Sequence, residues 1–389
     1  MYRYCLNRID DPCPGRSVSH STLLLQSSGE WPSVQQQQHS LFVAGSTLVV
    51  SPGVTAPLPA VTIHSPGKQL LVRPTTSFGT ESIRVSTFAL NQGGLSGKEV
   101  QIAVFYAREN RAHHISIFGI TNSLQKARGL KEHSPQANHG YATHAAFHSS
   151  LLVALSSTFQ LEIYHVTEDI IQPLRTMTSF SSFPPSSLTL CRTQSSYKIL
   201  LSYAVPMYPQ HWSVATTELS VREGEDKVMS RTIRVFNPMS ATWENIRPSE
   251  RVAQSTSGLG SGSGSPPRYG AKMASVAAVE TDGRWLVVAP SDDNLMEVYR
   301  IKQNRLLHSR TLLGPHHATV GLAVSEGRCV SVSRDGVAWV WDLECGWGVE
   351  VQSEPFLDGA VEPGARVVFD ERQIAVGCNG RVMIVRFDE

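Results

Sequence analysis

The chain has 389 residues, enough for a large buried core, and its 34 Lys and Arg against 33 Asp and Glu give a net charge of +1. This balance argues against a dedicated nucleic-acid or membrane-surface binder, because such proteins carry a large excess of one sign of charge. The six cysteines form no CxxC pair, so we expect neither a zinc site nor a disulfide framework.

The N-terminal sequence lacks the apolar core of a signal peptide, and no apolar run approaches the roughly 18 residues of a transmembrane helix. We therefore expect a soluble protein of the cytoplasm or the nucleus.

The chain begins with a polar segment and then alternates short apolar runs with turns. We expect residues 1–40 to be an irregular N-terminal segment and residues 41–389 to form one domain. A Ser- and Gly-rich stretch at 249–270 predicts a flexible surface loop within that domain, since it has little apolar surface to bury. A strand pair is predicted at 41–50, and further strands at 69–72, 86–90, 100–106, 114–120, 143–147, 151–155, 160–166, 187–191, 198–204, 212–221, 232–236, 273–279, 285–289, 295–301, 306–313, 322–324, 329–333, 337–343, 367–369, 373–376 and 381–387.

These strands recur with a regular period. When the units are aligned on Trp341, the equivalent residues include Phe118 and Tyr164, separated by 46 residues, and Tyr299, which precedes Trp341 by 42. Val385 follows Trp341 by 44 residues. A period of about 40–45 residues built from four short strands is typical of a β-propeller. The sequence thus predicts an all-β fold, a propeller of about seven four-stranded blades.

Residues 314–344 contain the clearest unit. Strands at 322–324, 329–333 and 337–343 are joined by turns at Glu326-Gly327 and at Arg334-Asp335-Gly336. An Asp-Gly pair between apolar runs is a strong hairpin signal, because the turn favours residues that accept positive φ.

This unit resembles a WD repeat, which has a His near its start, a Ser-x-Asp-Gly hairpin and a closing Trp-Asp. The resemblance implies a hydrogen-bonded chain of His317, a Ser that is either Ser331 or Ser333, Asp335 and Trp341. The sequence Gly-Pro-His-His at 314–317 leaves open which His takes part. In the other blades the Asp335 position is taken by Thr158, Asp293 and Asn379, so the full set is found once.

A Ser, a His and an Asp also suggest a hydrolase triad, but no Ser lies in a GxSxG elbow and the Asp lies in a tight turn. We therefore expect a structural network with no catalytic residue. The other tryptophans, Trp347 among them, are interpreted as packing anchors. Trp339 is the candidate binding residue, because we expect it on the face of its strand opposite Trp341.

Other candidate sites receive simpler interpretations. The His-rich region at 113–148 has no Cys or acidic cluster beside it, so we interpret it as scattered surface His and expect no metal. The Gly-rich stretch at 258–264 lacks the Gly-Lys-Ser/Thr of a phosphate-binding loop, so no cofactor is expected.

The closing sequence, TVGLAVSEGRCVSVSRDGVAWVWDLE followed by ARVVFDERQIAVGCNGRVMIVRFDE, resembles the C-terminal blades of fungal F-box proteins with WD-type propellers. In that family an F-box docks on the Skp-type adaptor of a cullin ubiquitin ligase and the propeller recruits the substrate. An F-box-like Leu-Pro helical segment is not found before the propeller, so we expect a propeller-only relative or a truncated gene product.

Two hypotheses about function follow. The first is a non-catalytic protein-interaction scaffold, in its specific form the substrate-recruiting propeller of an SCF-type ubiquitin ligase, with a Skp-type adaptor and a cullin as partners. The alternative is a propeller enzyme of the glycosidase or lactonase type, which needs carboxylates or metal ligands at the mouth of the channel.

Overall fold

The computed structural model describes residues 19–24, 40–44, 47–51, 59–65, 68–73, 83–94, 99–108, 111–121, 127–135, 140–167, 170–178, 187–193, 196–207, 211–222, 228–234, 274–280, 283–290, 295–302, 305–313, 317–351, 361, 365–378 and 381–387. Apart from one 3-10 turn, η1 (Gln92–Gly94), its regular elements are all strands. Within these ranges no helix is long and apolar enough to cross a membrane. The predicted loop at 249–270 lies outside the described residues.

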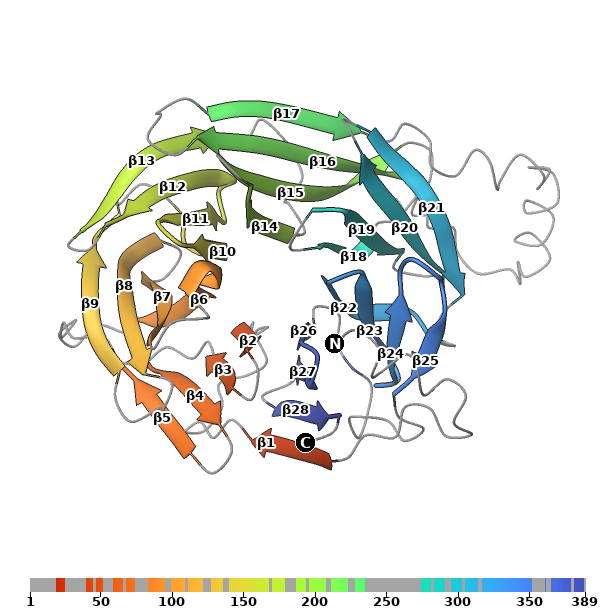
Figure 1. The fold of residues 1–389 in the computed structure, drawn as a ribbon, viewed down its shortest axis with the longest axis horizontal. Coiled ribbons are helices and arrows are strands. Elements are labelled where there is room, and N and C mark those ends of the chain that lie inside the picture. The colour runs from red at the N-terminus through yellow and green to blue at the C-terminus, as the bar shows by residue number, and fades with distance from the viewer. Residues whose placement is uncertain are drawn as a thin grey trace, which may run out of the picture.

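The described strands form seven antiparallel four-stranded sheets arranged around a common centre (Figure 1), so the predicted propeller fold is confirmed. From the centre outward, the first six blades are β2 (Ser40–Ala44), β3 (Thr47–Ser51), β4 (Val61–Ser65) and β5 (Lys68–Val72); β6 (Arg84–Leu90), β7 (Glu99–Arg108), β8 (Arg111–Thr121) and β9 (Ala127–His133); β10 (Ala142–His148), β11 (Leu151–Ser156), β12 (Gln160–Val166) and β13 (Ile171–Thr178); β14 (Ser187–Arg192), β15 (Ser196–Met207), β16 (His211–Arg222) and β17 (Val228–Arg234); β18 (Ala274–Val279), β19 (Trp285–Pro290), β20 (Leu295–Lys302) and β21 (Arg305–Leu313); and β22 (Thr319–Ser325), β23 (Arg328–Ser333), β24 (Ala338–Asp342) and β25 (Gly348–Glu350).

The seventh blade joins the two ends of the chain. Its inner strands are β26 (Arg366–Phe369), β27 (Gln373–Cys378) and β28 (Arg381–Arg386), and its outermost strand is β1 (Ser19–Leu24). β1 pairs with β28 along its whole length, from Ser19 opposite Arg386 to Leu24 opposite Arg381, and the two lie side by side in Figure 1. The expectation that residues 1–40 are irregular is therefore corrected at Ser19–Leu24. The strand has no neighbouring hairpin in the sequence, because its partner lies at the other end of the chain.

The core consists of seven apolar clusters, one at each interface between neighbouring blades. A blade is consequently covered on both faces, which is why its second strand is a nearly continuous apolar run. In β11, Leu151–Ser156, every residue is buried. The outer strands differ, since seven consecutive residues of β13 are exposed or partly exposed. Such strands lack apolar alternation, and β9, β13 and β25 were not predicted from the sequence for this reason.

The aligned residues of the repeat occupy the same place in their blades. Phe118, Tyr164, Tyr299, Trp341 and Val385 all lie on the third strand. They pair with Ile102, Leu152, Leu286, Cys329 and Ile374 on the second strand. In three blades the pairing between the third strand and the outer strand shifts register immediately before the aligned residue. These aligned residues are Phe118, Tyr164 and Tyr299. The repeat read from the sequence is thus also a repeat of sheet register.

Polar contacts tie neighbouring blades at the turns between their first and second strands. Asn91, which follows β6, accepts a hydrogen bond from the backbone N–H of Ser149 at 2.6 Å and donates one to the Ser149 carbonyl at 3.1 Å. Ser149 begins the turn between β10 and β11 and has a positive φ of 53°. Glu280, which follows β18, similarly accepts from the N–H of Gly327 in the sixth blade. The first contact joins the second and third blades, and the second holds the sixth blade, which carries the predicted network, against the fifth.

Candidate functional site: the polar network of the sixth blade

The two hairpin turns predicted for the sixth blade are present. Glu326 and Gly327 have φ values of 51° and 72°, so both central positions of the turn between β22 and β23 are left-handed. Gly336 has φ of 85° in the turn between β23 and β24. Both turns join adjacent antiparallel strands, and they set the positions of the polar side chains between them.

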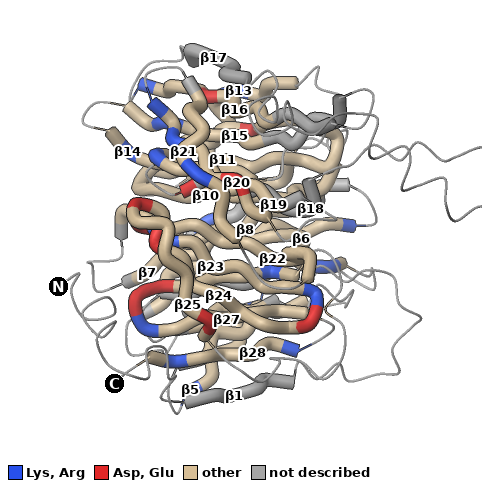
Figure 2. Tube along the Cα trace, turned by 90° about the vertical axis from the view of Figure 1, so that its right-hand side faces the viewer, with Lys and Arg blue, Asp and Glu red and all other residues tan. Residues whose placement is uncertain are grey.

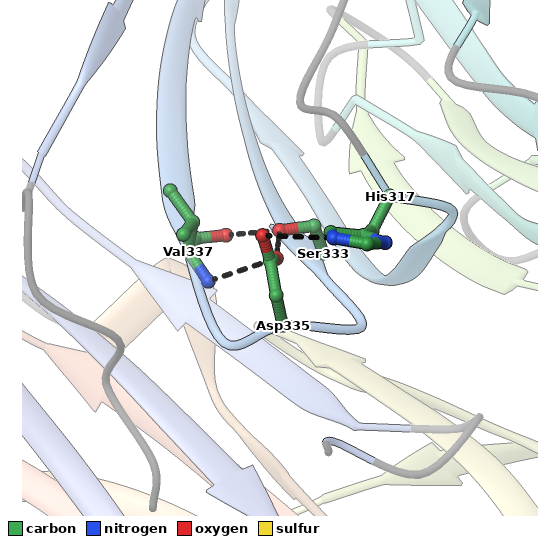
Figure 3. A network of polar contacts seen from close by, with 4 residues as sticks. All are labelled: His317, Ser333, Asp335 and Val337. Carbon is green, nitrogen blue, oxygen red and sulfur yellow. Dashed lines mark hydrogen bonds and ion pairs between the residues drawn. The ribbon is translucent and has the colours of Figure 1, made fainter. Parts of the chain in front are cut away.

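Asp335 is the centre of one polar group (Figure 3). The Ser333 hydroxyl donates to its carboxylate and lies 3.0 Å from the carbonyl oxygen of Val337. The backbone N–H of Val337 donates to the same carboxylate at 3.4 Å. Nε2 of His317 lies 3.9 Å from the other carboxylate oxygen, and 60% of the His317 side chain is exposed. The Asp335 carboxylate therefore fixes the hairpin through Ser333 and Val337, and His317 is a loose neighbour.

This order of residues differs from that of a hydrolytic triad. In a triad the His lies between the Ser and the Asp, so that it can remove the hydroxyl proton. Here the Asp335 carboxylate lies between Ser333 and His317, and the Ser333 side chain is buried. The Ser333 hydroxyl accordingly has a structural contact with Asp335.

Ser331 and Trp341 form a second, separate pair. The Trp341 indole N–H donates to the Ser331 hydroxyl oxygen at 2.9 Å, and the indole is only 3% exposed. Among the five residues of the predicted network, no hydrogen bond joins this pair to Ser333 and Asp335. Both serines thus take part, one in each pair, where the resemblance implied a single chain with one Ser.

Trp339 lies on the same face of β24 as Trp341. Their rings stack with centroids 5.2 Å apart and an interplanar angle of 17°, and both pack in the cluster between the fifth and sixth blades. The expectation of opposite faces is wrong, because side chains two residues apart in a strand share a face. Trp339 therefore supports the buried Trp341 ring, and its own N–H is buried without a hydrogen-bond partner.

Two other blades have a Glu and a Tyr at the positions that Trp339 and Trp341 occupy in the sixth blade. In the third blade the Tyr164 hydroxyl donates to Glu162, and in the fifth blade Tyr299 donates to Glu297. Burial raises the pKa of both tyrosines above the ordinary value, and the adjacent carboxylates raise it further. Burial likewise raises the pKa of Glu297, against a smaller opposing effect of the Tyr299 hydrogen bond. A Tyr with a Glu two residues before it thus replaces the tryptophan pair.

The third blade keeps part of the hairpin network as well. Ser156 and Thr158 occupy the places of Ser333 and Asp335, and their hydroxyl oxygens lie 3.0 Å apart. The Ser156 hydroxyl also accepts from the backbone N–H of Gln160 at 3.0 Å. Asp293 and Asn379 lie outside the described residues.

Trp347 is exposed, and the expectation that it is a packing anchor is wrong. Its side chain is 68% exposed in the turn between β24 and β25. The turn is rigid, because the Asp342 carboxylate accepts from the backbone N–H groups of Glu344 and Cys345, each at 2.8 Å. The guanidinium of Arg310 donates to the Glu344 carbonyl at 2.5 Å from the fifth blade. Trp347 is therefore an exposed aromatic side chain on a turn that is held in place.

The described residues offer little to a small-molecule or metal site. No group of three His, Cys, Asp or Glu side chains that could hold a metal ion occurs among them. A cavity between the second and third blades, lined by His114 and Glu162 among others, measures about 10 Å³, which is room for about one water molecule. Lys, Arg, Asp and Glu are mixed along both ends of the blades seen in Figure 2, in line with the balanced charge of the sequence.

Comparisons with known proteins agree with this architecture. The family model for the F-box protein pof12 β-propeller matches residues 67–378. The chain is similar in fold to the β-propeller domain of Cps50 (Swd1) from Myceliophteria thermophila, with a TM-score of 0.53 and 10% identity, over 95% of this chain and 100% of that one. It is also similar to a chain of the mitotic checkpoint complex, with a TM-score of 0.56 and 10% identity, over 98% of this chain and 94% of that one. No curated protein matches the sequence.

Proposed function

The chain belongs to the family of F-box protein pof12 β-propellers, and from this we propose that it recruits substrate proteins to an SCF-type ubiquitin ligase. The observation that carries the proposal is the family match over residues 67–378, which runs from the first blade into the seventh. The match concerns the propeller, the part that would hold the substrate. The Skp-type adaptor and the cullin would be reached through an F-box.

The rigid surface of the propeller supports the scaffold part of this proposal. Seven apolar clusters fix the blades against one another, so the described turns between their strands are held at set positions. Exposed tryptophans on rigid supports are common energetic centres of protein interfaces. We therefore place a partner contact at Trp347, on the turn braced by Asp342 and Arg310.

The ligase assignment is tested by purifying the tagged full chain from cells under native conditions and identifying its stable partners by mass spectrometry. Recovery of the Skp-type adaptor together with a cullin is the expected result. A different stable partner, with the adaptor and the cullin absent, would refute the ligase role and leave the scaffold role standing. The proposal also places the protein in the cytoplasm or the nucleus, which imaging of the tagged chain checks.

The contact at Trp347 is tested with a matched pair of variants. Trp347→Ala removes the exposed indole, and Leu71→Ala removes an exposed apolar side chain from β5 of the first blade, where 45% of the leucine is exposed. We expect Trp347→Ala to reduce recovery of the substrate-side partner at least tenfold and Leu71→Ala to leave it unchanged. Equal recovery with both variants would exclude the contact at Trp347.

A further inference from the structure

The two outer strands of the fifth blade carry an excess of positive charge. Within their bounds, β20 and β21 contain four Lys or Arg residues and a single acid, Glu297. Glu297 is only 6% exposed and accepts a hydrogen bond from Tyr299, so its carboxyl group adds little negative charge to the surface. Figure 2 faces this side of the molecule and shows Lys and Arg along β21. These strands therefore present a local cationic surface in a chain that is nearly neutral as a whole.

Three of the basic side chains lie on the face of the fifth blade that looks toward the sixth. Arg300 pairs with Trp285 across β19 and β20, and its guanidinium carbon lies 5.2 Å from the centre of the Trp285 ring. That ring packs in the cluster between the fifth and sixth blades. Lys302 shares this face with Arg300, because side chains two residues apart in a strand point the same way. Arg310 reaches the sixth blade directly, where it donates to the Glu344 carbonyl.

A register shift places an exposed leucine on the same face. β21 sets Arg310 opposite Val298 and Leu307 opposite Arg300, and the register shifts between Val298 and Tyr299. Residues that are directly opposite in an antiparallel pair share a face of the sheet. Leu307 and Arg310 consequently lie on one face although they are three residues apart in the sequence. The Leu307 side chain is 44% exposed, so this face offers apolar as well as charged groups to solvent.

The sixth blade leaves part of this face uncovered. Its outer strand β25 has three residues, whereas β21 has nine. Arg300 and Arg310 are accordingly partly exposed, and Lys302 is exposed. Among the described residues no ion pair joins these three cations to an acid. The outer part of the sixth blade brings two exposed acids to this region, Glu344 beside Arg310 and Glu350 at the end of β25, so the cations still outnumber the acids.

We propose that this surface, made of Arg300, Lys302, Leu307 and Arg310, binds an acidic extended segment of a substrate protein. An apolar side chain of the segment packs on Leu307, and its flanking carboxylates pair with the surrounding cations. The planar guanidinium matches a carboxylate through paired N–H donors, and complementary charge speeds association and selects the partner. The leucine among the cations favours a protein partner, because nucleic-acid surfaces combine basic groups with exposed aromatic rings.

The proposal rests on the proposed function only in taking the partner to be a substrate of the ligase. Arg310 joins the surface to the turn that carries Trp347, through its hydrogen bond to the Glu344 carbonyl. The substrate contact placed at Trp347 therefore continues onto the fifth blade, and the acidic segment is the chemical class of substrate that this continuation selects.

The test begins with selection of a random dodecapeptide display library on the purified full chain. We expect the enriched peptides to combine several Asp or Glu residues with an apolar residue. An enriched peptide is then labelled with fluorescein, and its affinity is measured by fluorescence anisotropy. Replacing its Asp and Glu by Asn and Gln should weaken binding about tenfold or more, and raising sodium chloride from about 50 to about 300 mM should also weaken it. Enriched peptides without acids would overturn the proposal.

A matched pair of double variants locates the binding surface. Lys302→Glu with Leu307→Asp alters the proposed surface, and Lys68→Glu with Leu71→Asp alters an exposed lysine and a 45% exposed leucine on β5 of the first blade. The first variant should lose affinity for the peptide about tenfold or more, and the second should bind like the wild type. Lys302→Gln with Leu307→Ser is the milder variant to be used if the charged one does not fold. Equal binding by both surface variants and the wild type would refute the site.

Two further measurements separate other occupants and the ligase role. A single-stranded oligonucleotide that displaces the peptide would assign the surface to nucleic acid, and a dimer in light scattering that Lys302→Glu with Leu307→Asp abolishes would assign it to a second copy; either result overturns the proposal. Recovery of the adaptor and the cullin from cells tests the ligase role separately. Their absence, with peptide binding intact, refutes the ligase role alone, and their recovery without peptide binding refutes the surface alone.

Discussion

Replacing Trp341 by Ala tests the packing of the sixth blade most directly. The indole is 3% exposed, its N–H donates to Ser331, and its ring stacks on Trp339. Gly348 lies on β25 against the ring, where a Cβ would come within 2.3 Å of the indole carbons. Deleting a buried aromatic side chain of this kind lowers the free energy of unfolding by about 3–5 kcal/mol. The lost hydrogen bond to Ser331 accounts for about 1 kcal/mol of this loss, and the cavity and lost packing account for the rest.

Three further variants divide that effect into its parts. Trp341→Phe keeps most of the packing and loses the hydrogen bond, so its loss should be clearly smaller than that of Trp341→Ala. Ser331→Ala leaves a buried indole N–H without an acceptor, which should lower stability by about 1–3 kcal/mol. Trp347→Ala is the matched control in the same blade, because its exposed indole should change stability by no more than about 0.5 kcal/mol.

The assay is urea unfolding followed by far-ultraviolet circular dichroism, since fluorescence would report the removal of the tryptophan itself. The expected order of stability loss is Trp341→Ala, then Trp341→Phe, then Trp347→Ala with almost none. A Trp341→Ala protein that unfolds at the wild-type urea concentration would contradict the assignment of Trp341 as a buried blade residue. Equal losses for the Ala and Phe variants would show that the hydrogen bond, and not the packing, dominates.

Three other predictions concern the rest of the ring. Asn91→Ala removes the cap on Ser149 between the second and third blades, which should lower stability by roughly 2 kcal/mol, measured by urea unfolding. The pKa of Glu297 is raised in the folded state, so the wild type loses stability as the pH rises above the ordinary carboxyl value toward the raised one. Glu297→Gln lacks this loss, and its melting temperature relative to the wild type should increase between about pH 4 and pH 7, whereas the exposed Glu344→Gln should show no such trend. Deleting residues 1–24 removes β1 and leaves β28 as an open edge, so we expect a lower melting temperature and self-association by light scattering; an unchanged monomer would refute the role of β1 in closure.

Much of the fold follows from interactions between neighbours in the chain, and these could be predicted. The hairpin turns at Glu326-Gly327 and Asp335-Gly336 depend on residues that accept positive φ, and that preference is a local property. The apolar second and third strands of most blades are equally local, because burial on both faces requires apolar residues wherever the strand lies. The alignment on Trp341 worked for this reason, and it placed Phe118, Tyr164, Tyr299 and Val385 at the equivalent position of the third strand. The third strand of the first blade, β4, was not predicted.

The remaining features depend on segments that are distant in the sequence, so only the tertiary structure decided them. β1 is a strand because β28 offers it a free edge. Trp347 is exposed because Arg310 and Asp342 hold its turn outward, whereas Trp341 is buried against the fifth blade. Local conformational preference thus fixed the blades, while ring closure determined which side chains are buried and which are exposed.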